Sequence, residues 1–149
     1  MSTNGATAKK KNNRGRSKVL QQCDELTMLS YNVRGLNTEA KQQKVYEVLR
    51  QVKPQLVCLN ETKLQSALYL DHYWSFQTTA QRNGGVWTAS LTNAKLSMVK
   101  TIGTYLCWTQ LEIGAHQIQV LNCYLEPGEQ QDLKERARRV VDVAKDITK

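Results

Sequence analysis

Side chains alternate with a period of two over residues 26–31, which predicts a strand. The period then changes, because apolar residues recur at helical spacing after Thr38, which suits the N-cap position of a helix. Glu39 sits favourably in the first turn, and Pro54 cannot continue a helix. We therefore predict one helix over residues 39–52, with an apolar stripe of Val45, Val48, Leu49 and Val52.

A second apolar run, residues 55–60, is short and nearly continuous. Such a run is typical of a strand that is covered on both faces, as in a parallel pair joined by a helix. Strand, helix and strand together predict a βαβ unit with a right-handed crossover. Asn32 and Glu61 then follow the carboxyl ends of two parallel strands, where α/β sheets commonly place their sites.

The rest of the chain predicts an antiparallel meander and a terminal helix. Strand patterns cover residues 72–76, 85–91, 98–102, 105–113 and 117–124, with a polar turn at 81–84. In the last of these strands, Ile118, Val120, Asn122 and Tyr124 share a face. An amphipathic helix follows Gly128, with Leu133, Ala137, Val140, Val141, Ala144 and Ile147 as its apolar positions. The fold class is therefore α/β (α+β), with no internal repeat.

The net charge of +8 resides mostly in the first 23 residues, which hold six basic residues and no acid. We expect residues 1–23 to form a disordered basic arm and residues 24–149 to form one partial domain. The arm is either a flexible solubilising tail or a tether for nucleic acid or a nuclear-import signal. Its basic residues are Lys9, Lys10, Lys11, Arg14, Arg16 and Lys18.

The sequence has no apolar leader and no run long enough for a membrane span, so we expect a soluble, intracellular protein that is not secreted, nuclear rather than cytoplasmic. Its four cysteines show no C-x-x-C spacing and are expected to be reduced, with Cys58 and Cys123 as small core residues. His72 and His116 stand alone in the sequence, which argues against a zinc site.

Four sequence motifs are informative because of their order and spacing: LSYNVRGLN at 29–37, VCLNETK at 57–63, GGV at 84–86 and VLNCYLEP at 120–127. In order and spacing together, the chain from Leu26 to Val143 resembles the N-terminal half of the endonuclease/exonuclease/phosphatase family. It is most similar to the apurinic-type endonuclease domain of non-LTR (LINE-like) retrotransposons. The resemblance implies the first half of a four-layer α/β/β/α sandwich, and an enzyme that nicks DNA.

The resemblance implies a role for three residues at one site. Glu61 would be the carboxylate ligand of Mg²⁺ or Mn²⁺, Asn32 would add its side-chain oxygen, and Tyr124 would donate a hydrogen bond to a phosphate oxygen. The nucleic-acid phosphates would be contacted by Arg34, Asn37 and Lys63. Taken singly, Asn32 could instead start a turn, Glu61 could be a solvated acid and Tyr124 a surface strand residue.

Two motifs of such families, Gly-Asp-Phe/Trp-Asn and Ser-Asp-His, do not occur in the 149 residues. They would supply the aspartate that activates water and the histidine that polarises the phosphate, so we expect an incomplete site. Asn60 also replaces the glutamine expected before Glu61. The alternatives are an inactive remnant that binds nucleic acid through its arm, or a phosphatase acting on a small phosphoester.

An incomplete fold should also affect partners. We expect only the first of two sheets, with an inner face that lacks a partner and gives marginal stability. The chain would then associate with itself, with the missing C-terminal half, or with a reverse transcriptase domain in a longer polyprotein.

Overall fold

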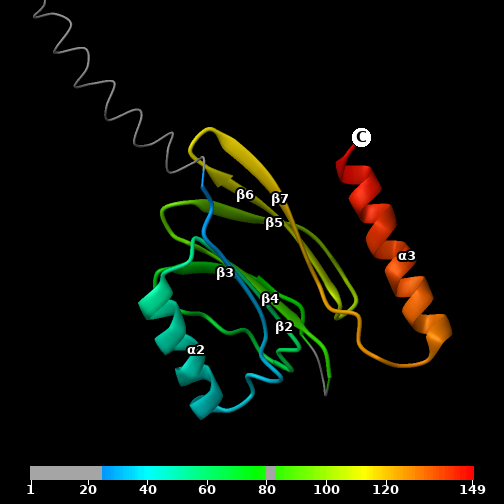
Figure 1. Cartoon of the computed structure of the whole chain (residues 1–149), viewed down its shortest axis with the longest axis horizontal. Coiled ribbons are helices and arrows are strands. Elements are labelled where there is room, and N and C mark those ends of the chain that lie inside the picture. Colours follow the sequence, from blue (N-terminus) through cyan, green and yellow to red (C-terminus); the bar gives the residue numbers. More distant parts are fainter. Residues whose placement is uncertain (1–24, 80–82) are drawn as a thin grey trace, which may run out of the picture.

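The computed structural model describes residues 25–79 and 83–149, and the predicted basic arm, Cys23, Gln81 and Arg82 lie outside these residues. The described residues form two sheets and two helices (Figure 1). In chain order the elements are β1 (Met28–Asn32), α2 (Glu39–Val52), β2 (Leu56–Asn60), β3 (Tyr73–Gln77), β4 (Val86–Leu91), β5 (Lys95–Ile102), β6 (Leu106–Ile113), β7 (His116–Cys123) and α3 (Gln130–Ile147).

The predicted βαβ unit is confirmed. β1 and β2 pair in parallel, with Asn32 beside Asn60, and α2 connects them. The Thr38 side chain caps α2 by accepting a hydrogen bond from the backbone N–H of Lys41 at 3.3 Å. Lys53 ends the helix in the left-handed conformation, directly before Pro54. Local sequence signals therefore set both ends of this helix.

The antiparallel strands do not form one meander. β3 and β4 join the first sheet, whose order is β1-β2-β4-β3, whereas β5, β6 and β7 form a second sheet. β5 also begins at Lys95, three residues before the predicted start, and β7 ends one residue before Tyr124. The chain changes sheet between Leu91 and Lys95, a choice that alternation of side chains along each strand does not encode.

The expectation of an unpartnered inner face is wrong. The two sheets pack face to face around a shared core of buried residues, which comprises Leu56, Cys58, Ala94, Leu96, Leu111, Ile113 and Val120. The first two belong to β2, and most of the others belong to the second sheet. This core gives the inner face of the first sheet an apolar partner within the same chain.

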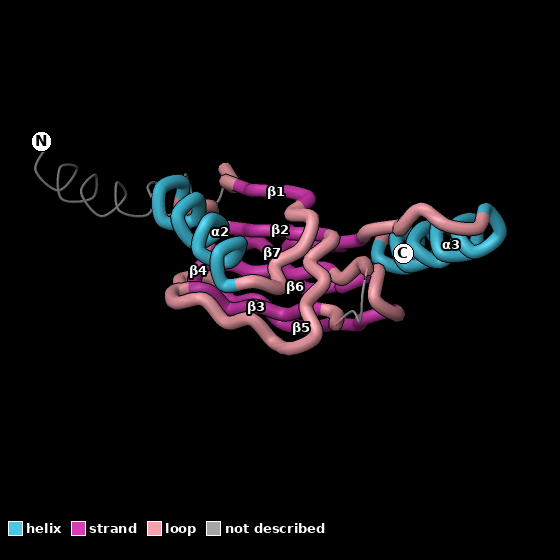
Figure 2. Tube along the Cα trace, turned by 90° about the horizontal axis from the view of Figure 1, so that it is seen from below, coloured by secondary structure: helices cyan, strands magenta, loops and turns pink. Residues whose placement is uncertain are grey.

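The two helices lie on opposite sides of the pair of sheets (Figure 2), and α2 packs against the first sheet and α3 against the second, as the four-layer arrangement requires. Leu49 of α2 packs with Val57 and Leu59 of β2, and Val143 of α3 packs near Leu121 and other residues of the second sheet. The prediction that Val141 lies on the apolar face of the last helix is wrong, because 49% of this residue is exposed. The stripe runs through positions 140, 143 and 147, and residue 141 lies about 100° around the helix from residue 140.

The cysteines of the described residues are free thiols. Cys58 and Cys107 are buried and form no disulfide, and burial raises the pKa of Cys58 to about 12 and that of Cys107 to about 11. Cys58 is a core residue as predicted, whereas Cys123 is only half-buried. Neither helix of the described part is long and apolar enough to cross a membrane.

Candidate active site

Two neighbouring strand ends form the floor of the candidate site. The parallel pairing continues past β1 and β2, because the N–H of Gly35 donates to the carbonyl of Glu61 at 2.7 Å and that of Leu36 to Thr62 at 2.7 Å. Arg34 and Glu61 both adopt positive φ, at 52° and 57°. Non-glycine residues rarely adopt this conformation, so the two strand ends turn sharply at the same level.

Asn32 starts this turn. Its side-chain oxygen accepts a hydrogen bond from the backbone N–H of Arg34 at 3.1 Å, so the turn interpretation of Asn32 is correct. The residue is exposed, and an amide oxygen has a second lone pair. The structural role therefore leaves the predicted metal role of Asn32 open.

Tyr124 reaches the same site from the second sheet. It lies just after β7, where its backbone N–H donates to the carbonyl of Tyr105 at 2.9 Å. Its hydroxyl donates to Oε1 of Glu61 at 2.7 Å, across 63 residues of sequence. This bond, followed by burial and by the charges of Glu61 and Glu126, raises the pKa of Tyr124 to about 12. Tyr124 is therefore not a free surface phenol, and Glu61 is not a solvated acid without a partner.

The glycine motif completes the arrangement. The N–H of Lys63 donates to the carbonyl of Gly84 at 2.9 Å, and that of Thr62 to Gly85 at 3.1 Å. A Cβ atom on Gly84 would lie 3.8 Å from Oε2 of Glu126, so this carboxylate lies beside the glycine turn. All four sequence motifs of the resemblance thus meet at one place, although they are spread over about 100 residues.

Sequence reasoning gave no role to Asn122, which the structure places at the join between the sheets. Asn122 is 3% exposed. Its amide donates to the carbonyls of Leu59 at 3.2 Å and Trp87 at 3.0 Å, and to the hydroxyl of Thr88 at 3.0 Å. The sequence feature that could have identified Asn122 is its position as a polar residue on the same strand face as the apolar Ile118 and Val120. Asn122 lies two residues before Tyr124, and it contacts Leu59, which lies two residues before Glu61. Asn122 therefore links the two strands that carry Tyr124 and Glu61.

A basic cluster borders the turn that follows β1. A Cβ atom on Gly35 would lie 3.4 Å from Nζ of Lys41, 3.4 Å from Oδ1 of Asn37 and 3.5 Å from Cδ of Lys63. Asn37 and Lys63, both predicted to contact phosphates, therefore lie together over Gly35. Lys41 joins them from the first turn of α2 and was missed by the sequence reasoning. Arg34 is exposed beside this cluster, whereas Lys9, Lys10, Lys11, Arg14 and Arg16 lie outside the described residues.

Glu61, Asn32 and the nearby Glu126 offer hard oxygen donors of the kind that Mg²⁺ prefers. Within residues 25–79 and 83–149, no three His, Cys, Asp or Glu side chains form a cluster that could hold a metal. Mg²⁺ usually takes one or two carboxylates and completes its shell with water and substrate phosphates, so a cluster of three is not needed. Glu61 and Asn32 are therefore residues of a type that could hold Mg²⁺ or Mn²⁺.

No protein-family model and no curated protein sequence matches the chain. The similar solved structures are proteins of the endonuclease/exonuclease/phosphatase fold, and the chain has this fold in part. It is similar to the endonuclease domain of TRAS1, a telomere-specific non-LTR retrotransposon, with a TM-score of 0.59, 15% identity, and coverage of 77% of this chain and 53% of that one.

Two further structures show the same fold. For truncated Caenorhabditis elegans TDP2 the TM-score is 0.57 at 16% identity, covering 82% of this chain and 55% of that one. For the AP endonuclease LMAP from Leishmania major the TM-score is 0.55 at 18% identity, covering 68% of this chain and 40% of that one. The chain thus spans between 40% and 55% of the length of these three structures.

Proposed function

We propose that the chain supplies the metal-binding and phosphate-binding half of a phosphodiesterase site that nicks DNA, and that it derives from a retrotransposon endonuclease. The hydrogen bond between Tyr124 and Glu61 carries this proposal, because it brings two candidate residues from different sheets into one site. The similarity to nuclease structures supports the same class of reaction. Mg²⁺ or Mn²⁺, when bound by Glu61 and Asn32, would neutralise charge on the scissile phosphate and the leaving oxygen.

Tyr124 acts as a hydrogen-bond donor in this proposal. With a pKa raised to about 12, its phenol keeps its proton at neutral pH. The hydroxyl now donates to Glu61, and it can turn to a phosphate oxygen as negative charge builds there. The glycine turn and the strand ends hold Glu61 and Tyr124 in place, so little reorganisation is needed when the phosphate binds.

The basic cluster of Lys41, Lys63 and Arg34 would hold neighbouring phosphates of the same strand. Such contacts position a nucleic acid without reading its sequence. They also favour a second candidate, a non-catalytic binder of nucleic acid, since phosphate contacts alone give salt-dependent affinity. Activation of the attacking water is not assigned to any residue of this chain. In the proposal it belongs to the C-terminal half that the similar structures contain, in a longer protein that could include a reverse transcriptase domain.

Metal-dependent DNA binding and plasmid nicking would separate these candidates. We expect Mn²⁺ to tighten binding of a short duplex at fixed ionic strength, and Glu61→Ala to abolish that gain. The matched control is Glu47→Ala, which removes an exposed carboxylate from α2. Affinity that falls with salt but is the same with and without Mn²⁺ would favour the binder.

Nicking of supercoiled plasmid in Mg²⁺ tests the reaction itself. Any activity of the chain should fall by a factor of about 10² or more in Glu61→Ala and remain in Glu47→Ala. Measurable nicking that is equal for the chain and Glu61→Ala would refute the metal site. Turnover of a small phosphomonoester without any nicking would point to a phosphatase.

A further inference from the structure

Backbone strain is concentrated in two places within the described residues. Five residues other than glycine adopt positive φ there, a strained conformation that clusters where ligands are held. Three of them, Arg34, Glu61 and Lys63, belong to the candidate site. The other two, Lys53 with φ 49° and His72 with φ 72°, line one pocket at the C-terminal end of α2. The strain therefore points to this pocket as a second place that can hold a ligand.

The pocket has a volume of about 330 Å³, which is within the range of small-molecule sites. Its lining comes from α2 and Lys53, from residues 70–73 and from Leu91 at the end of β4, and we call it the α2–β3 pocket. Leu49 and Leu70 are buried and give it an apolar lining.

The α2–β3 pocket lies on the side of the first sheet that this chain closes by itself. The sheet order is β1-β2-β4-β3, so β4 and β3 are on the side away from β1. The edge of β3 is covered by the segment before it, since the Gln77 side chain accepts from the N–H of Leu68 at 2.8 Å and donates to the carbonyl of Ser66 at 2.9 Å. No residue of β1 and none of the basic cluster lines the pocket. The pocket is therefore separate from the candidate site and from β1.

Two tyrosine rings line the pocket in fixed positions. The hydroxyl of Tyr46 donates to the carbonyl of Tyr69 at 3.4 Å, and that of Tyr73 donates to the carbonyl of Pro54 at 3.2 Å. These bonds anchor both rings to the backbone before any ligand binds, which lowers the cost of ordering the site. An aromatic ligand can pack against such rings, and the neighbouring leucines add apolar contact. The lining therefore favours a flat ring system.

The rim of the pocket is basic. Arg50 and Lys53 line it, and both are exposed. The guanidinium carbon of Arg50 lies 5.8 Å from the centroid of the Tyr46 ring, which holds this charge beside the pocket. The ion pairs of the described residues involve Lys95 and Lys149. Within the same residues, Arg50 and Lys53 therefore have no carboxylate at ion-pair distance.

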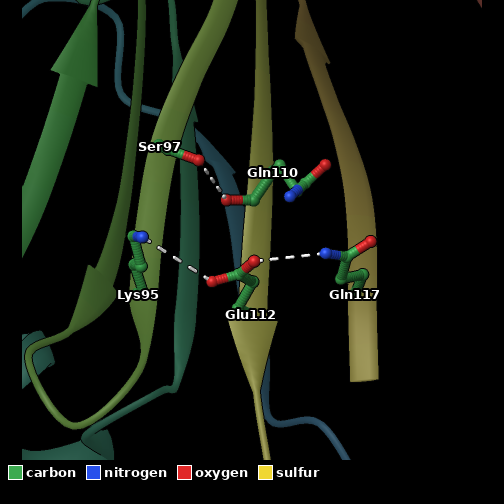
Figure 3. Close-up of polar contacts among 5 residues, drawn as sticks. All are labelled: Lys95, Ser97, Gln110, Glu112 and Gln117. Atoms are coloured by element: carbon green, nitrogen blue, oxygen red, sulfur yellow. Dashed lines mark hydrogen bonds and ion pairs between the residues drawn. The ribbon is translucent and has the colours of Figure 1, made fainter. Parts of the chain in front are cut away.

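Polar side chains on the second sheet show the opposite case (Figure 3). Lys95 extends toward Glu112, with 4.0 Å between Nζ and Oε2, and Gln117 donates to Oε1 of Glu112 at 3.2 Å. The hydroxyl of Ser97 donates to the carbonyl of Gln110 at 3.5 Å. These groups satisfy one another, so their face of the sheet needs no ligand. The cations of the α2–β3 pocket lack such partners, which leaves them to an anion.

We propose that the α2–β3 pocket binds a small aromatic anion, namely a flat ring system that carries one carboxylate or sulfonate group. The ring packs against Tyr46 and Tyr73. The anionic group bonds to Arg50 and Lys53 at the rim, where hydrogen bonds between charged groups are strongest. This inference does not depend on the proposed function.

The charge balance of the pocket limits the ligand to a single negative charge. Asp71 also lines the pocket, so its carboxylate offsets one of the two cations. The C-terminal end of α2 adds a negative charge of about half an elementary charge. The positive charge that remains suits a monoanion, whereas a dianion such as a phosphate monoester would meet more repulsion.

A nuclear magnetic resonance titration tests the ligand class. Amide shifts of the nitrogen-15-labelled chain are followed as 1-naphthoate is added, and we expect the largest changes at residues 50–53 and 70–73. The Kd should be on the order of millimolar for so small a ligand. Naphthalenemethanol keeps the ring without the charge, and acetate keeps the charge without the ring, so each should bind more weakly by about threefold or more.

Three results of this titration would overturn the proposal. The first is the absence of localised changes with 1-naphthoate, and the second is a set of changes centred on the basic cluster instead. The third is equal binding of naphthalenemethanol, which would show that the rim does not recognise the anionic group.

Two variants at the rim test the anion contact. Arg50→Gln and Lys53→Asn should each weaken binding of 1-naphthoate by about threefold or more, with the remaining amide shifts unchanged. Asparagine is chosen because it tolerates the left-handed conformation of position 53. The matched control is Arg138→Gln, which removes an exposed arginine of α3 and should leave the affinity unchanged. Unchanged affinity in both rim variants, or an equal loss in Arg138→Gln, would refute the proposed contact.

Discussion

Asn122 is a buried polar residue that joins the two sheets. Its amide group has two N–H bonds and serves three acceptors at 3.0–3.2 Å, all of them on β2 or β4. Asn122→Ala removes both donors and leaves a small void. A buried polar group left without a partner costs about 1–3 kcal/mol. With two donors lost, we expect a loss of unfolding free energy of roughly 2–4 kcal/mol.

Such a loss would be large against a total stability of about 5–15 kcal/mol, so it is easily measured by urea unfolding. The matched control is Gln117→Ala on the same strand, where the side chain is exposed and bonds to Glu112 at 3.2 Å. That change should cost less than about 0.5 kcal/mol. A loss for Asn122→Ala that is no larger than the loss for Gln117→Ala would refute the inference.

The same variant should also disturb the site. Asn122 holds the strand that leads to Tyr124, so its removal should loosen the bond between Tyr124 and Glu61. The pKa of Tyr124 should then fall from about 12 toward its ordinary value of 10. Tyr73, whose pKa is raised by burial at a different place, serves as an internal reference. Nuclear magnetic resonance of ring-labelled tyrosine reports both groups in one titration.

Three further outcomes follow from the structure. Glu61→Gln should lower the pKa of Tyr124, which absorbance at 295 nm measures. Because the folded pKa of Tyr124 lies above the unfolded value, the stability that its bond to Glu61 contributes is present below pH 10 and lost as pH rises toward 12. An unchanged titration of Tyr124 in Glu61→Gln would show that the bond is unimportant. Gly35→Ala should destabilise the fold and weaken DNA binding several-fold, because φ +104° is strained for a residue with a Cβ and relief of that strain would move the turn that carries the basic cluster. Unchanged affinity in a folded variant would contradict the basic cluster. Cys58 should resist Ellman's reagent until unfolding, since its thiol is buried with a pKa of about 12; rapid native labelling would contradict that burial.

The sequence by itself determined the βαβ unit and the place of the candidate site at the ends of its two strands. The helical period, the Thr38 cap and Pro54 are local signals, and the structure gives the helix the predicted range of 39–52. Parallel pairing then follows from the crossover, and it necessarily brings Asn32 and Glu61 to neighbouring strand ends. Each step depends on residues close together in the chain, and such interactions are encoded by spacing.

Only the tertiary structure decided how the later strands divide between two sheets. A period of two predicts which side chains share a face, but it does not predict which strand lies next to which, so the strand pattern alone favours a single meander. The division gives the first sheet its apolar partner, and it carries Asn122 and Tyr124 across to β2, β4 and Glu61. These contacts join residues from 34 to 63 positions apart, and their energy exists only when both sheets are packed.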